Sequence, residues 1–173
     1  LKHIKENPDL FVGIELEFPI VHTDGKPTDI EVSKELMCFL VKALNLEVER
    51  RDKEGNPIQL LEAFSQDRIL FEVSYTTLEF AFGRARSIQE IESRFETYMK
   101  VIQRKLGEKD HAIQGWGIHP NWDINDNRPV AYPRYQMLMD YLSMGSHQES
   151  AHLHDFPQYG AFICGSQVQL DVS

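Results

Sequence analysis

The chain has 173 residues, of which 42% are hydrophobic and 26% are charged, so its composition excludes a disordered or collagen-like protein and predicts one packed domain or a large part of one. A formal net charge of -9 argues against nucleic acid as the main ligand, because phosphate backbones bind basic surfaces. No apolar run is long enough to predict a transmembrane helix, and the first residues lack the apolar core of a signal peptide.

The first predicted element is a strand at residues 10–21. Its even positions from 14 to 20 are apolar, whereas Glu15 and Glu17 occupy odd positions. Side chains two residues apart on a strand point to the same face. We therefore expect the two carboxylates side by side, on the face opposite the apolar one.

A helix and a hairpin are predicted to follow this strand. Residues 22–27 have the composition of a turn, and Thr28 and Glu31 have the spacing of a capping box. Apolar residues then recur at helical spacing as far as about Leu46, which predicts an amphipathic helix. Residues 48–61 are expected to form a hairpin, because Gly and Pro favour a turn at its centre.

Residues 68–83 are predicted to be extended, but not as one flat strand. Apolar side chains occupy odd positions in the first half and even positions in the second half. A strand with both halves facing the core must therefore be interrupted. We expect a turn or bulge near residues 74–77, which places Glu72 and Glu79 together on the polar face.

The second half of the chain is expected to begin with a helix. Ser87 and Glu90 form a capping box, apolar residues follow at steps of three and four, and Gly107 is the expected stop. A strand, a long surface loop, a short helix, an exposed segment and a final alternating strand should follow, at residues 111–119, 120–133, 134–143, 146–157 and 159–173. This order favours an α+β fold with a largely antiparallel sheet whose polar face is open.

Four carboxylates are thus expected on strands that are dense in large apolar residues: Glu15, Glu17, Glu72 and Glu79. Their grouping on one face costs free energy in desolvation and repulsion unless a cation lies among them. Carboxylate and amide oxygens favour Mg²⁺ or Mn²⁺ over zinc. The alternative interpretation is the solvated face of a one-sided antiparallel sheet.

Three blocks in chain order resemble the glutamate-cysteine ligases, or γ-glutamylcysteine synthetases. Residues 13–17 (Gly-Ile-Glu-Leu-Glu), with Glu72 and Glu79 farther on, resemble the N-terminal metal-binding pattern of this family. Residues 117–122 and 132–142 are similar to a proline-rich segment and an Arg-Tyr helix of its plant and proteobacterial branch. Residues 167–173 resemble the strand that follows them there. Together these blocks extend over most of the chain.

The resemblance implies the fold of the glutamine-synthetase-like carboxylate-amine ligases, an α+β fold whose curved, largely antiparallel sheet forms a funnel. The implied reaction is ATP-dependent ligation of the γ-carboxylate of glutamate to the amine of cysteine through a γ-glutamyl phosphate, the first step of glutathione synthesis. Family members have several hundred residues. We therefore expect residues 1–173 to be the N-terminal part of a single catalytic domain, inactive alone, whose remaining ATP and metal ligands lie downstream.

The resemblance also implies roles for individual residues. Ligands of Mg²⁺ or Mn²⁺ would be Glu15, Glu17, Glu72, Glu79 and Gln169, with ATP as co-substrate. Arg134 would bind a substrate carboxylate, because a planar guanidinium matches carboxylate geometry; the alternative is a surface arginine that caps a loop. His119 would contact substrate, or else be a structural histidine at a strand end. Trp116 and Trp122 are expected to serve packing.

Two other functions stay open: a related ligase with a different amine acceptor, and a non-catalytic binding domain that keeps the fold. The expected partners are glutamate, cysteine and ATP, with neither nucleic acid nor membrane, and the edge at residues 167–173 is expected to favour association with another copy. Cys38 and Cys164 form no metal motif, which favours reduced thiols in the cytoplasm. The histidines at 147, 152 and 154 are too irregularly spaced for a zinc site.

Overall fold

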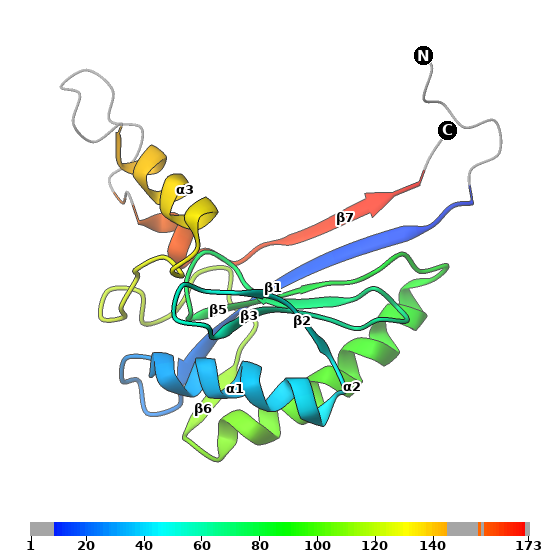
Figure 1. The fold of residues 1–173 in the computed structure, drawn as a ribbon, viewed down its shortest axis with the longest axis horizontal. Coiled ribbons are helices and arrows are strands. Elements are labelled where there is room, and N and C mark those ends of the chain that lie inside the picture. The colour runs from blue at the N-terminus through cyan, green and yellow to red at the C-terminus, as the bar shows by residue number, and fades with distance from the viewer. Residues whose placement is uncertain (1–8, 145–155, 157, 172–173) are drawn as a thin grey trace.

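The protein has an α+β fold, in which a mostly antiparallel sheet carries two long helices on one face (Figure 1). The structure is a computed structural model that describes residues 9–144, 156 and 158–171. Its elements are β1 (Val12–His22), α1 (Ile30–Ala43), β2 (Glu47–Arg51), β3 (Pro57–Leu61), β4 (Arg68–Phe71), β5 (Thr77–Ala81), α2 (Ile88–Gly107), β6 (His111–Ile113), α3 (Pro133–Met144), a 3₁₀ helix (Tyr159–Ala161) and β7 (Ser166–Leu170). The predicted order of strands and helices is confirmed.

The sheet has the strand order β2-β3-β4-β5-β1-β6, and β7 also pairs with β1. Strand β1 is long enough to have two neighbours on its outer side, because residues 12–16 pair with β7 and residues 20–22 pair with β6. Helices α1 and α2 lie beneath the sheet in Figure 1, whereas α3 stands at one end on the opposite side. No described helix covers the upper face of the sheet between α3 and β7, which is called the open face below.

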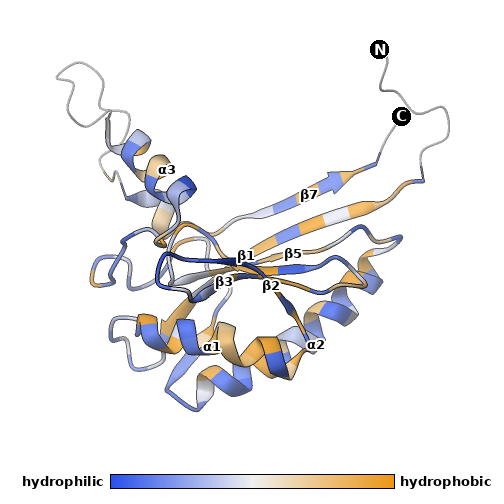
Figure 2. Ribbon diagram, viewed as in Figure 1, coloured by the Kyte–Doolittle hydropathy of each residue, from blue (hydrophilic) through white to orange (hydrophobic). Residues whose placement is uncertain are grey.

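The core lies between the sheet and the two long helices. Leu36 and Leu40 of α1 and Ile102 of α2 are fully buried, as is Leu78 of the sheet. Hydrophobic and hydrophilic residues alternate along both helices in Figure 2. Burial of apolar side chains stabilises the fold by about 1.5–3 kcal/mol for each large residue, so this packing decides which face of the sheet the helices cover.

Two capping predictions have different outcomes. Ser87 is the N-cap of α2, and its side chain accepts a hydrogen bond from the backbone N–H of Glu90, as expected. Helix α1 instead begins after Asp29, whose side chain accepts from the N–H of Glu31. Thr28 is buried, and its hydroxyl donates to the Ile20 carbonyl at 2.6 Å. The predicted capping residue is thus wrong by one position, because tertiary contacts use the threonine hydroxyl.

The predicted interruption of residues 68–83 is confirmed, since β4 ends at Phe71 and β5 begins at Thr77. The predicted strand at 111–119 is too long, because β6 ends at Ile113 and Ile118 forms only an isolated bridge with Ile163. The exposed segment predicted at 146–157, with its three histidines, lies outside the described residues except for Phe156, which is exposed.

The outer edge of β7 is open in the described part of the chain. All five residues of this strand are exposed, and β1 is the strand with which it pairs. Association with another copy through this edge stays a prediction. Among the helices that the structure describes, none has the length and apolar character needed to cross a bilayer.

Asp67 joins three parts of the fold below the open face. Its side chain is buried and accepts hydrogen bonds from the Gly83 backbone N–H at 2.8 Å, from Arg94 at 2.6 Å and from the Tyr98 hydroxyl at 2.8 Å. The residue therefore ties the β3–β4 loop to the end of β5 and to α2.

Substitution Asp67→Ala should lower the free energy of unfolding by about 2–4 kcal/mol, because three donors lose a buried acceptor. Urea denaturation would measure the change. Asp126→Ala is the matched control, since it breaks the ion pair with Arg128, whose side chain is 83% exposed, and should cost about 1 kcal/mol or less. Equal losses of unfolding free energy in the two variants would contradict this structural role of Asp67.

Candidate functional site

A row of mostly polar side chains crosses the open face of the sheet. Arg50, Gln59, Leu70, Glu79 and Glu17 lie opposite one another on β2, β3, β4, β5 and β1, in that order. Residues directly opposite each other in antiparallel strands point to the same face. The row therefore has a basic end on β2 and an acidic end on β5 and β1.

A second row runs beside the first, through Arg68, Ala81, Glu15 and Gln167. Together the two rows form the floor of a cavity of about 540 Å³. Its lining also includes Glu49, Glu72, Arg134 and Tyr135. The four carboxylates predicted from the sequence thus line the same cavity, although they come from three separate segments.

Glu79 is the most deeply placed of these carboxylates, since the residue is only 8% exposed. Burial raises the pKa of Glu79 to about 9, and a hydrogen bond with Glu72 and the charges of Glu72, Glu15 and Glu17 act in the same direction. Two carboxyl groups that share a proton avoid placing like charges together. Without a cation, this cavity therefore favours protonated Glu79.

Glu17 lies against the segment before β7. Burial raises the pKa of Glu17, and the Glu72 and Glu15 charges add to this, whereas the hydrogen bond from the Gly165 backbone N–H at 2.7 Å opposes it. The neighbouring Cys164 thiol has a pKa raised to about 12 by burial and by the charge of Glu17. Both cysteines are free, and Cys38 is exposed.

Tyr135 fixes Glu72 at the rim of the cavity. Its hydroxyl lies 3.1 Å from Glu72 Oε2 and 2.9 Å from the Phe71 carbonyl oxygen. Burial and the charge of Glu72 raise the pKa of the tyrosine, so it remains a neutral donor. Arg134, the preceding residue, also lines the cavity. The start of α3 therefore contributes two adjacent side chains to the site.

Glu49, Arg50, Gln59 and Arg68 were missed by sequence reasoning. The register of β2 against β3 shifts between Val48 and Arg50, which leaves Glu49 as an extra residue. Such a bulge lets successive side chains reach the same face. Glu49 pairs with Arg68 through oxygen–nitrogen distances of 2.8 and 3.1 Å, and it also accepts from Gln59.

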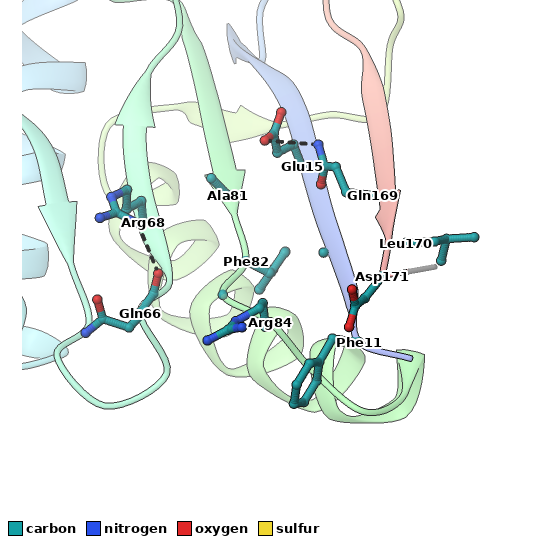
Figure 3. A pocket seen from close by; sticks show the side chains of 12 residues that line it. Phe11, Glu15, Gln66, Arg68, Ala81, Phe82, Arg84, Gln169, Leu170 and Asp171 are labelled. Carbon is teal, nitrogen blue, oxygen red and sulfur yellow. Dashed lines mark hydrogen bonds between the residues drawn. The ribbon is translucent and has the colours of Figure 1, made fainter. Parts of the chain in front are cut away.

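Gln169 lies beside the cavity lined by the four glutamate side chains (the glutamate cavity) rather than in its lining. Its amide donates to Glu15 Oε1 at 3.2 Å, and both side chains line a neighbouring cavity of about 500 Å³ (Figure 3). Phe11 and Arg84 lie on the far side of that cavity. Gln167, which stands opposite Glu15, reaches the glutamate cavity instead.

His119 is fully buried away from both cavities. Its Nε2 atom lies 2.9 Å from the Ile20 carbonyl oxygen and 3.3 Å from the Thr28 hydroxyl, and Asn125 also contacts the ring. Burial lowers its pKa. These contacts favour the structural alternative over contact with substrate. Trp122 packs on Phe162, with 5.1 Å between ring centroids.

The carboxylates do not converge on one point. Within the part of the chain that the structure describes, no three His, Cys, Asp or Glu side chains are placed to hold a metal ion together. Glu15, Glu17 and Glu72 each accept a hydrogen bond from a protein group, namely Gln169, Gly165 and Tyr135. Their oxygens nevertheless suit a hard divalent cation.

Comparison with known proteins does not assign the chain to a family. No family model matches the chain, and no curated protein matches it. The interpretation of the site therefore depends on its residues and their arrangement.

Replacement of Glu79 by Gln should stabilise the metal-free protein at alkaline pH. A carboxyl whose folded pKa is raised from 4.5 to about 9 contributes its full stability below pH 4.5 and loses it as the pH rises toward 9. From pH 5 to pH 8 the wild type should lose about 2 kcal/mol or more relative to Glu79→Gln. Urea denaturation with a chelator present would measure this.

Glu92→Gln on the exposed side of α2 is the control, and its pH dependence should match that of the wild type. The assignment of Glu79 fails if its glutamine variant loses as much stability over this pH range as the wild type does.

Proposed function

We propose that the chain is the N-terminal part of the catalytic domain of a glutamate-cysteine ligase, which joins the γ-carboxylate of glutamate to the amine of cysteine at the expense of ATP. The observation that carries the proposal is the shared cavity of Glu15, Glu17, Glu72 and Glu79. An open antiparallel sheet with helices on its other face is compatible with the glutamine-synthetase-like fold, which belongs to the same proposal.

The donor chemistry of the cavity fits Mg²⁺ or Mn²⁺. Glu79 is buried among three like charges, and a divalent cation would offset both their repulsion and the desolvation of the carboxylate. Glu15, Glu17, Glu72 and Glu79 would hold the metal, after side-chain rotations that bring them together. When bound, the metal would neutralise charge on the phosphoryl group during its transfer.

Protein groups around the cavity would contribute to the reaction by binding and orienting the substrates. ATP would phosphorylate the γ-carboxylate of glutamate, with release of ADP, and the amine would then displace phosphate from the acyl phosphate as the C–N bond forms. Arg134 at the rim would hold a substrate carboxylate. Tyr135 keeps Glu72 directed into the cavity through its hydrogen bond. Gln169 holds one oxygen of Glu15 from the side of the neighbouring cavity.

A related ligase with another amine acceptor is the second candidate, because one or two pocket residues decide between similar amines. A non-catalytic domain is the third candidate. In that case the carboxylates would be the solvated side of a one-sided sheet, and their neutralisation would leave metal and nucleotide binding unchanged.

Addition of Mg²⁺ at pH 8 should raise the thermal midpoint of the chain, since a ligand that binds only the folded state stabilises it. Glu17→Gln should reduce this increase by at least half, because the variant removes a charge from the proposed site. Differential scanning calorimetry at constant ionic strength would measure both, with Glu92→Gln as the control. Equal increases in all three proteins would argue against a metal at these carboxylates.

The full-length protein should consume ATP only when glutamate and an amine acceptor are both present, and it should form γ-glutamylcysteine with cysteine. Glu17→Gln and Glu79→Gln should each lower kcat by 100-fold or more, on the order expected for lost electrostatic stabilisation of a transition state. A coupled ADP assay and mass spectrometry of the product would test this. The proposal fails if neither cysteine nor any other amine supports turnover.

A further inference from the structure

The basic end of the glutamate cavity contains arginines that differ in their partners. Arg68 is paired with Glu49 through two nitrogen–oxygen contacts. Arg50 and Arg134 also line the cavity, but neither forms an ion pair with a carboxylate among the described residues. A hydrogen bond from Arg68 lowers the pKa of Glu49, and the nearby charge of Arg50 acts in the same direction. Among the described residues, however, no carboxylate forms a direct ion pair with the guanidinium of Arg50 or of Arg134, and both face an acidic cluster. This separation of charge suits a ligand that presents an anionic group to the arginines.

Arg50 is directed into the cavity by the bulge in β2. The register shift after Val48 places Arg50 opposite Gln59, which begins the row that leads through Leu70 to Glu79. The guanidinium carbon also lies 5.6 Å from the centroid of the Tyr132 ring. Stacking on an aromatic face holds a guanidinium in place and leaves its N–H groups free for an anion.

Side-chain contacts of Tyr132 and Tyr135 connect the arginine end of the cavity to the acidic end. The rings of Tyr132 and Tyr135 meet edge to face, with 6.0 Å between centroids, and Tyr135 contacts Glu72. Arg134 lies between these two tyrosines in the sequence, at the start of α3. One short segment, residues 132–135, thus places Arg134, the ring beneath Arg50 and a partner of Glu72 around the same cavity.

We propose that Arg50 and Arg134 together bind the α-carboxylate of the glutamate substrate, while its γ-carboxylate extends toward the acidic cluster. This inference rests on the proposed function and adds Arg50 as a residue that determines the substrate. Arg50 and Glu79 lie on strands separated by two others, so their backbones are roughly 14 Å apart. A long arginine side chain and an amino dicarboxylate can share that distance.

The decisive experiment compares L-glutamate with isoglutamine, its α-amide, in the full-length protein. Arg50→Ala and Arg134→Ala should each raise KM for glutamate about tenfold or more, because a charge-assisted hydrogen bond to the α-carboxylate is lost. KM for ATP should change less than twofold. Wild-type protein should prefer glutamate to isoglutamine, and Arg50→Ala should abolish most of that preference. Arg50→Lys should be intermediate, since an ammonium cannot form the bidentate contact.

Arg104→Ala, on the exposed surface of α2, is the control and should leave KM for both compounds unchanged. Isothermal titration of glutamate measures binding independently of turnover. If turnover occurs but Arg50→Ala retains the wild-type preference for glutamate, the inference is overturned and the ligase proposal stands. Glutamate binding that weakens in Arg50→Ala without any turnover supports the inference and contradicts the ligase proposal. Absence of glutamate binding overturns both.

Discussion

The alternation of side chains along antiparallel strands governs how this protein distributes its charges. Helices α1 and α2 occupy one face of the sheet, so every apolar side chain that points there has a core to join. The intervening polar side chains must then point to the other face, where Glu17 and Glu79 stand opposite each other. This constraint brings like charges together despite the free-energy cost of desolvation and repulsion.

The open face is organised by contacts that stabilise particular side-chain positions as well as by strand pairing. Tyr135 joins α3 to the Phe71 carbonyl and to Glu72, and Gly165 holds Glu17. Natural proteins often retain locally unfavourable arrangements, such as this cluster of like charges, where function requires them. The pairing of Arg68 with Glu49 is favourable by contrast, because it neutralises one arginine of the cavity. Arg50 and Arg134 are left to bind a ligand.

Much of the fold followed from the sequence, because the signals were local. The change of apolar parity within residues 68–83 predicted the turn between β4 and β5, and with it the shared face of Glu72 and Glu79. Contacts between distant segments were less accessible. Asp29 rather than Thr28 caps α1 because the Thr28 hydroxyl bonds to β1. The periodicity of the sequence likewise does not predict the packing of His119. No pattern in residues 47–51 predicts that Arg50 pairs with Gln59.

The irregularity in β2 has a consequence for how this edge of the protein tolerates changes in length. A strand that already accommodates one surplus residue at Glu49 differs from its neighbours, since loss of a single amino acid there would remove the first of the two register shifts in this pair and leave the second, at Ile58 of β3. The deletion would impair ligand binding at this edge, because β2 could no longer present an acidic and a basic side chain in succession to the same face.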